Sequence, residues 1–130
     1  MATILVVDDA KVMREMIKTI LITEKHEVLT AEDGDIALEQ ARKQNCDMVL
    51  SDINMPRMSG ISLVSKLRRV AGYEDIPIIM LTTESSDYKK DKAKKMGANG
   101  WLQKPVEPKR LIKAVNTMLA KAGHVLPVRD

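Results

Sequence analysis

Cysteine and aromatic residues are scarce in this chain. Its 130 residues include one cysteine, one tryptophan, two tyrosines and no phenylalanine. A single cysteine, Cys46, cannot form an internal disulfide, which fits a reducing compartment, and a packed or solvated bystander is favoured over a redox sensor. No apolar run approaches membrane-spanning length, and apolar residues begin too close to Met1 to leave room for a signal peptide. We therefore expect a cytoplasmic protein with no membrane association.

Positive charge is concentrated in one part of the chain. Residues 85–113 hold nine Lys/Arg and three Asp/Glu, a net charge of +6, whereas the whole chain has a net charge of +3. A basic segment is one sign of nucleic-acid binding. However, the sequence has no helix-turn-helix or zinc-finger pattern and few aromatics. A solvated lysine-rich face or an acidic protein partner is favoured over nucleic acid.

Four short apolar runs each end beside a residue suited to handling phosphate. The runs are 4–7, 48–51, 78–81 and 101–103, and the residues that follow them are Asp8 with Asp9, Asp52, Thr82 and Lys104. Apolar runs of this length between amphipathic stretches are typical of buried parallel strands. In an open parallel sheet the carboxyl ends of the strands share one edge, where ligands bind. The sequence therefore predicts that three carboxylates, a hydroxyl and an ammonium converge at one site.

Helical patterns fill the spaces between these strands. Predicted helices cover 11–23, 33–44, a segment that opens after Gly60 and reaches Val70, 87–96, and a segment that starts at Pro108 and is ended by Gly123. A short edge strand covers 27–31. The residues expected to face the sheet include Val12, Met13, Met16, Ile17, Ile20 and Leu21 in the first helix, and Tyr88, Ala93 and Met96 in the lysine-rich fourth helix. A strand followed by a helix, five times over, predicts one α/β domain with helices on both faces of the sheet. We expect this domain over residues 1–122 and a tail over 123–130.

The predicted cluster has a definite chemistry. Neighbouring carboxylates repel one another and raise their pKa values unless a cation lies between them. Mg²⁺ prefers oxygen ligands and is commonly held by one or two carboxylates and a phosphate oxygen, so Asp8, Asp9 and Asp52 form a candidate magnesium site. Asp52, at the end of the predicted central strand, could attack phosphorus and form an aspartyl phosphate. Lys104 would then neutralise the phosphoryl oxygens, and Thr82 would donate a hydrogen bond to one of them.

The chain resembles the receiver domains of bacterial response regulators over residues 3 to about 122. The resemblance rests on 6–9 (VVDD), 51–56 (SDINMP), 58–60 (MSG), 81–82 (LT), 98–100 (ANG) and 104–105 (KP). It implies a flavodoxin-like, doubly wound (βα)5 sheet of strand order 2-1-3-4-5. It also implies that Asp52 is phosphorylated, that Asp9 binds Mg²⁺ directly with Asp8 in the outer shell, and that the Asn54 carbonyl completes the coordination. The Lys104–Pro105 bond is expected to be cis.

The resemblance assigns further roles. Asn54 and Glu84 are expected to overhang the acyl phosphate and to influence its lifetime. Trp101 stands where receivers usually carry Tyr or Phe, and we expect it to respond to phosphorylation by filling space that Thr82 vacates. The face formed by the fourth helix, fifth strand and fifth helix commonly binds targets. Here it would present Lys89, Lys90 and Lys92, with Lys94 and Lys95 on the same helix, around Trp101, which suits a peptide with acidic residues and an apolar anchor.

The motifs are closest to those of single-domain, chemotaxis-type (CheY-like) receivers. They predict a monomeric signalling switch that takes phosphoryl from a histidine kinase and then binds a target such as a flagellar motor switch component. A phosphorelay carrier or phosphate sink is the alternative within the same chemistry. An Asp-nucleophile phosphatase of the haloacid dehalogenase type is a remote alternative. That group carries its nucleophile after the first strand in an Asp-x-Asp pattern, whereas Asp8-Asp9 is followed by Ala10 here, and no inserted cap encloses a substrate. A flavodoxin is less favoured still, because it would need a phosphate-binding loop rich in Ser, Thr and Gly after the first strand. This chain has the acidic segment 8–11 (DDAK) there, which would repel phosphate without a metal.

Overall fold

A single parallel sheet organises the computed structural model, which describes residues 2–83 and 87–123. Its strand order is β2-β1-β3-β4-β5, as the resemblance implies. The strands are β1 (Thr3–Val7), β2 (Glu27–Ala31), β3 (Met48–Asp52), β4 (Ile78–Thr82) and β5 (Gly100–Gln103). All neighbouring pairs in this sheet run parallel, so the carboxyl ends of the strands lie along one edge. The predicted α/β fold is confirmed.

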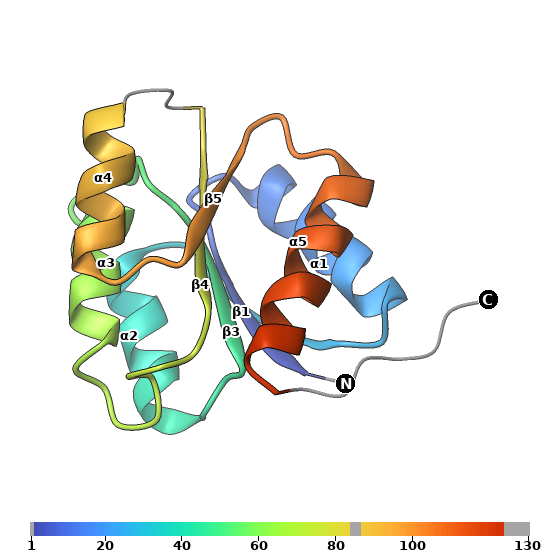
Figure 1. Cartoon of the computed structure of the whole chain (residues 1–130), viewed down its shortest axis with the longest axis horizontal. Helices are drawn as coiled ribbons and strands as arrows, with labels where there is room; N and C mark the ends of the chain where they lie inside the picture. The colour runs from blue at the N-terminus through green and yellow to red at the C-terminus, as the bar shows by residue number, and fades with distance from the viewer. Residues whose placement is uncertain (1, 84–86, 124–130) are drawn as a thin grey trace.

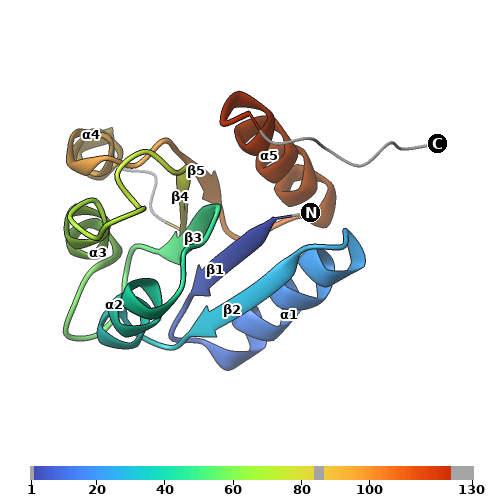
Figure 2. The ribbon, with the colours of Figure 1, turned by 90° about the horizontal axis from the view of Figure 1, so that it is seen from below.

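Helices cover both faces of the sheet (Figures 1 and 2). The helices α1 (Lys11–Thr23) and α5 (Pro108–Lys121) pack on one face, and α2 (Gly34–Lys43), α3 (Gly60–Leu67) and α4 (Asp87–Met96) pack on the other. None of the helices in the described ranges has the length and apolar character needed to cross a lipid bilayer. Residues 124–130 of the predicted tail lie outside the described ranges.

The central strands are apolar on both sides because both sides are covered. In β1, Ile4 and Val6 face the layer of α1 and α5, while Leu5 and Val7 face the layer of α2, α3 and α4. Every residue of β3 and β4 is buried. Continuous apolar runs are therefore required here, and this is why the sequence located these strands correctly.

Capping residues set the helix boundaries. The Asp33 carboxylate accepts a hydrogen bond from the backbone N–H of Ile36 at 2.9 Å and so begins α2. The Ser59 hydroxyl accepts one from Ser62 at 3.1 Å and begins α3, which satisfies backbone donors left free in the first turn. The predicted α2 extended one residue further at each end, because its two capping positions were counted as helix. The predicted α3 was too long: it ends at Leu67, and Val70 packs against the core from the turn that follows.

Some residues predicted to face the sheet are exposed. In α1, Ile17 and Leu21 are buried, but Val12 is 84% exposed and Met16 36% exposed. In α4, only Ala93 is buried, and Tyr88 is 72% exposed. Val12 and Tyr88 each lie five residues before a buried residue of their own helix, which places them roughly 140° away around the helix axis. That angle lies outside the apolar stripe, so these side-chain predictions were wrong.

The fifth predicted strand is an edge strand rather than a buried one. Along β5 exposed and partly buried residues alternate, and Trp101 is 41% exposed. Among the described residues, β4 is the one strand that pairs with it. No residue of β5 is fully buried, so the prediction that this run forms a buried strand was wrong.

Cys46 is buried beside Tyr73 on the same side of the sheet as α2 and α3. The hydroxyl of Tyr73 donates a hydrogen bond to the Gln44 carbonyl at 2.5 Å. Burial raises the pKa of the Cys46 thiol, so the reactive thiolate form is disfavoured. This environment supports a packing role for the single cysteine.

Candidate functional site

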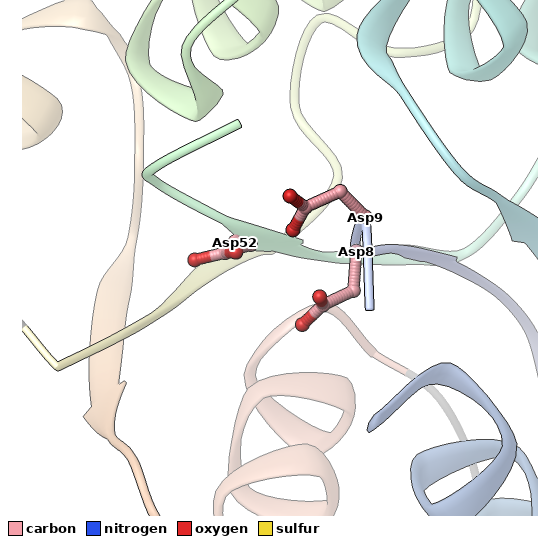
Figure 3. Close-up of side chains that lie close together, drawn as sticks. All are labelled: Asp8, Asp9 and Asp52. Atoms are coloured by element: carbon pink, nitrogen blue, oxygen red, sulfur yellow. The ribbon is translucent and has the colours of Figure 1, made fainter. Parts of the chain in front are cut away.

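Three carboxylates come together at the carboxyl edge of the sheet. Asp8 and Asp9 follow β1, and Asp52 ends β3, the strand that pairs with β1. One oxygen from each of the three lies within 4.8 Å of the others. Figure 3 shows the three side chains gathered around one space beyond the strand ends. The predicted convergence of the acidic residues is confirmed.

Lys104 brings a positive charge into the same cluster. Its Nζ lies 2.8 Å from Asp8 Oδ2 and 3.4 Å from Asp52 Oδ2. The residue directly follows β5, and its backbone N–H donates to the Thr82 carbonyl at 2.8 Å, which ties the ends of β4 and β5 together. The Lys104–Pro105 bond is cis, as expected. An ammonium in this position compensates two carboxylates at once.

Burial and charge compete at these groups. Asp8 is fully buried, Asp52 is 7% exposed and Asp9 lies open to solvent. Burial raises the pKa of Asp52, and Lys104 opposes this shift without cancelling it. Burial alone would lower the pKa of Lys104, but the hydrogen bond from Lys104 to Asp8 and the charges of Asp52 and Asp8 outweigh it and raise that pKa. The site therefore stabilises the charged form of Lys104 and destabilises the ionised form of Asp52.

Local hydrogen bonds hold the acidic loop in place. The Asp8 carboxylate accepts from the backbone N–H of Ala10 at 2.9 Å, and the Asp8 carbonyl accepts from the Arg14 guanidinium at 2.7 Å. Asp52 Oδ1 accepts from the backbone N–H of Asn54 at 3.4 Å. Arg14 was not among the predicted site residues, since its role depends on the first turn of α1 folding back toward the β1 loop.

Gly60 is a second residue that sequence reasoning did not assign a role. A Cβ atom at this position would lie 2.0 Å from the carbonyl oxygen of Asp52, and the Gly60 N–H donates to the Ile53 carbonyl at 2.7 Å. The first turn of α3 therefore rests directly against the loop that carries Asp52.

The other predicted site residues that the structure describes lie on β4, on β5 and on α4. Thr82 ends β4 and is buried, one position beyond the residue paired with Asp52. Trp101 lies on β5 with the Lys90 Nζ 5.1 Å from its ring centroid, a cation–π contact between α4 and β5. Lys89 is partly buried and Lys92 is exposed on the same helix. Glu84 lies outside the described residues, so its predicted role is untested.

The donor set fits a divalent metal ion. It consists of carboxylate oxygens, one group exposed and two buried, and hard cations such as Mg²⁺ prefer oxygen ligands with room for water. The exposed Asp9 leaves an open approach on one side. Thiolate or imidazole ligands, which softer metals prefer, are absent from this acidic group.

Comparison with known proteins identifies the family of this constellation. A family model described as the response regulator receiver domain matches residues 4–116. The chain belongs to that family. It is 39% identical over 122 residues to Protein PilH of Pseudomonas aeruginosa, covering 92% of this chain and 99% of that protein.

Two further relatives agree in length and fold. A Chemotaxis protein CheY homolog of Campylobacter jejuni is 40% identical over 118 residues, with 89% of this chain and 91% of the relative covered. The solved structure of chemotaxis protein CheY4 of Vibrio cholerae superimposes with a TM-score of 0.88 at 43% identity, covering 91% of this chain and 98% of that one. The chain is therefore similar to single-domain receivers over nearly the whole of their length.

Proposed function

We propose that this receiver accepts a phosphoryl group on Asp52 from the phosphohistidine of a sensor kinase. The observation that carries the proposal is the convergence of Asp8, Asp9 and Asp52 within 4.8 Å, with Lys104 Nζ in contact with two of them. A purely structural explanation does not account for three acids and one ammonium at the edge of a parallel sheet where ligands bind. Membership of the receiver family supports the same reading.

The transfer is a nucleophilic displacement at phosphorus. A carboxylate oxygen of Asp52 forms the new O–P bond, the P–N bond to the donor histidine breaks, and its electron pair remains on the imidazole nitrogen. The negative charge at the acceptor then grows, because the single charge of the carboxylate is replaced by the charge of a phosphoryl group, about −1.5 to −2 at neutral pH. Lys104, already next to Asp52, is placed to compensate this charge.

Asp8, Asp9 and Asp52, with the backbone carbonyl of Asn54, are the residues that would hold Mg²⁺. When bound, the ion neutralises the phosphoryl oxygens and the acidic cluster together. The protein itself supplies the orientation: Asn54 N–H contacts one oxygen of Asp52, and the Lys104 ammonium contacts the other. Asn54 is exposed above the acceptor, which suits its proposed influence, shared with Glu84, on the phosphoryl lifetime.

The proposed output is a switch in partner binding. Thr82, buried at the end of β4, would turn toward the phosphoryl group, and Trp101 on the neighbouring strand would follow. The proposed partner face lies around Trp101, where the Lys90 Nζ is 5.1 Å from the ring centroid, and it suits an acidic peptide with an apolar anchor. Lys89 and Lys92, also predicted for this face, instead line the side of α4 that faces α3. The names of the CheY relatives support a chemotaxis pathway. The proposed target within such a pathway is a flagellar motor switch component.

The proposal includes a monomeric state. It also includes a cytoplasmic location, because the donor phosphohistidine is made from cytoplasmic ATP. The chemistry is tested by incubating the protein with acetyl phosphate and Mg²⁺ and measuring its intact mass. We expect one phosphoryl adduct on the wild type and none on Asp52→Asn. An adduct of equal yield on both proteins would contradict the proposal.

A second measurement separates a motor-control switch from a phosphorelay carrier or phosphate sink. Beryllofluoride with Mg²⁺ mimics the phosphorylated state, so binding of a motor-switch peptide should rise when it is added. A carrier would instead pass phosphoryl from the purified, phosphorylated chain to a second histidine protein. Transfer without peptide binding would favour the carrier.

A further inference from the structure

A groove between α3 and α4 lies next to the acceptor loop and shares Asn54 with the proposed site. The two helices lie side by side in both views (Figures 1 and 2). The groove has a volume of about 460 Å³, within the range of roughly 300–1,000 Å³ typical of small-molecule sites. Its lining comes from the acceptor loop, from α3 with its cap, and from α4.

The lining of the groove is divided by chemical type. Ile53 and Ile61 are buried apolar residues at its acceptor-loop and α3 side, and Met96, 40% exposed, closes it at the end of α4. The α3 wall carries three hydroxyl groups, from Ser59, Ser62 and Ser65. The three serines recur every third residue, which places them along one side of the helix.

The α4 wall supplies positive charge. Tyr88, Lys89 and Lys92 line it, and no acidic residue contributes to the lining. Lys92 and Tyr88 are both exposed, the latter by 72%. A concave surface with apolar side chains at its base, hydroxyl donors on one wall and ammonium groups on the other is complementary to an organic anion that carries an apolar body.

We propose that the α3–α4 groove binds a small amphipathic anion, an aromatic or acyl body that ends in a carboxylate, sulfonate or phosphate. The apolar body lies against Ile53, Ile61 and Met96, and the anionic head lies between the serine hydroxyls and Lys92. Burial of apolar surface supplies most of the affinity. The charge-assisted contact selects anions over neutral molecules of the same shape.

Asn54 connects the groove to the acceptor. Asn54 lines the groove, and its backbone N–H donates to Asp52 Oδ1 at 3.4 Å. A ligand that contacts Asn54 therefore binds with different affinity when Asp52 is modified, and coupling of this kind is reciprocal. This coupling rests on the proposed function, whereas the binding site itself does not.

The binding site is tested with 8-anilinonaphthalene-1-sulfonate, whose fluorescence rises in apolar surroundings, and with the neutral N-phenyl-1-naphthylamine as the matched probe. We expect saturable binding of the sulfonate by the folded chain and weaker binding of the neutral probe. Lys92→Glu should weaken sulfonate binding about tenfold or more, as expected for loss of a charge-assisted contact. Lys94→Glu, the same change at an exposed residue of α4 that does not line the groove, should leave it unchanged.

Ser62→Trp, which fills the groove, should abolish binding of both probes, with circular dichroism confirming that each variant is folded. Equal affinity for the wild type, Lys92→Glu and Ser62→Trp would overturn the site. The coupling is tested by repeating the titration with beryllofluoride and Mg²⁺, which should change the sulfonate affinity of the wild type but not that of Asp52→Asn. An unchanged affinity in a chain that still takes phosphoryl from acetyl phosphate would overturn the coupling and leave the proposed function standing.

Discussion

The ammonium of Lys104 lies between two carboxylates, 2.8 Å from Asp8 Oδ2 and 3.4 Å from Asp52 Oδ2. These residues are far apart in the sequence and meet because β1 and β3 are neighbours and β5 ends at the same edge of the sheet. The contact is short and largely shielded from solvent, with the Lys104 side chain 13% exposed. The cation therefore replaces some of the positive charge that a metal ion would supply.

Removal of this cation should destabilise the protein in the absence of divalent metal. We expect Lys104→Met to lower the free energy of unfolding by roughly 1.5–3 kcal/mol, the usual worth of hydrogen bonds to charged groups. Mg²⁺ should stabilise the variant more than the wild type, because the ion restores the missing charge. Urea unfolding with and without MgCl₂ measures both effects, with Lys94→Met as the exposed control. An identical response to Mg²⁺ in variant and wild type would argue against charge compensation by Lys104.

Metal binding should itself stabilise the fold. At a Mg²⁺ concentration ten times the dissociation constant, ligand linkage predicts an increase of about 1.4 kcal/mol in the free energy of unfolding. Asp9→Asn should reduce this increase while leaving the metal-free stability nearly unchanged, because Asp9 is exposed. Asp91→Asn, at an exposed acid on α4, is the control. A full Mg²⁺ effect in Asp9→Asn would remove this residue from the proposed ligand set.

Gly60 gives a test of how closely α3 supports the acceptor loop. A Cβ there would lie 2.0 Å from the Asp52 carbonyl oxygen, so Gly60→Ala must displace backbone. We expect a loss of about 1–3 kcal/mol in stability, as for overpacked cores, and slower phosphorylation of Asp52. Gly100→Ala is the matched control, because its Cβ would meet nothing closer than the Met118 methyl group at 3.5 Å. Equal behaviour of the two variants would mean that the loop tolerates displacement.

Trp101 should report the switch by fluorescence. It is the only tryptophan, and Lys90 lies 5.1 Å from its ring centroid. A rearrangement that draws Thr82 toward the phosphoryl group should change the surroundings of the indole, so emission should shift on addition of beryllofluoride and Mg²⁺. Asp52→Asn should show no shift. A flat signal in the wild type, with the adduct verified by mass, would assign Trp101 a static packing role.

His26 predicts a pH dependence of stability that is independent of the acidic site. It is buried, its Nδ1 accepts from the Ala2 N–H at 3.2 Å, and burial lowers its pKa below the ordinary value of 6.5. Below pH 6.5 His26 becomes protonated in the unfolded chain but stays neutral in the folded protein. The free energy of unfolding therefore decreases as the pH falls from 6.5 toward the lower pKa of the folded state.

The wild type should therefore lose stability relative to His26→Gln between pH 7 and pH 5, by about 1.4 kcal/mol for each unit by which the pKa is lowered. Urea midpoints at both pH values measure the difference. Parallel pH profiles for the two proteins would show that His26 protonates equally well in the folded state.

The sequence was sufficient for the strands and for the acidic site. The buried strands β3 and β4 each begin with at least three consecutive apolar residues, because helices cover both sides of the sheet. The convergence of Asp52 and Lys104 was predicted from position alone, since the carboxyl ends of parallel strands must meet at one edge. Thr82 lies at the end of β4 as predicted, and its role stays a prediction. The pairing of Lys104 with Asp8 was not anticipated.

What the sequence could not supply was geometry between elements. Val12 and Tyr88 are apolar residues in amphipathic helices, but their exposure depends on the rotation of each helix about its own axis. The close approach of Gly60 to Asp52 depends on how α3 packs against the loop after β3, which no local pattern encodes. The α3–α4 groove likewise exists only after two helices with little sequence in common are placed side by side.

The most direct test of the account is to locate the phosphoryl group. Treating the phosphorylated protein with borohydride reduces an aspartyl phosphate to homoserine, which peptide mapping by mass spectrometry then assigns to a position. The account predicts homoserine at position 52 and at no other aspartate. Homoserine at position 8 or 9, or a phosphoryl adduct with Asp52 intact, would contradict it.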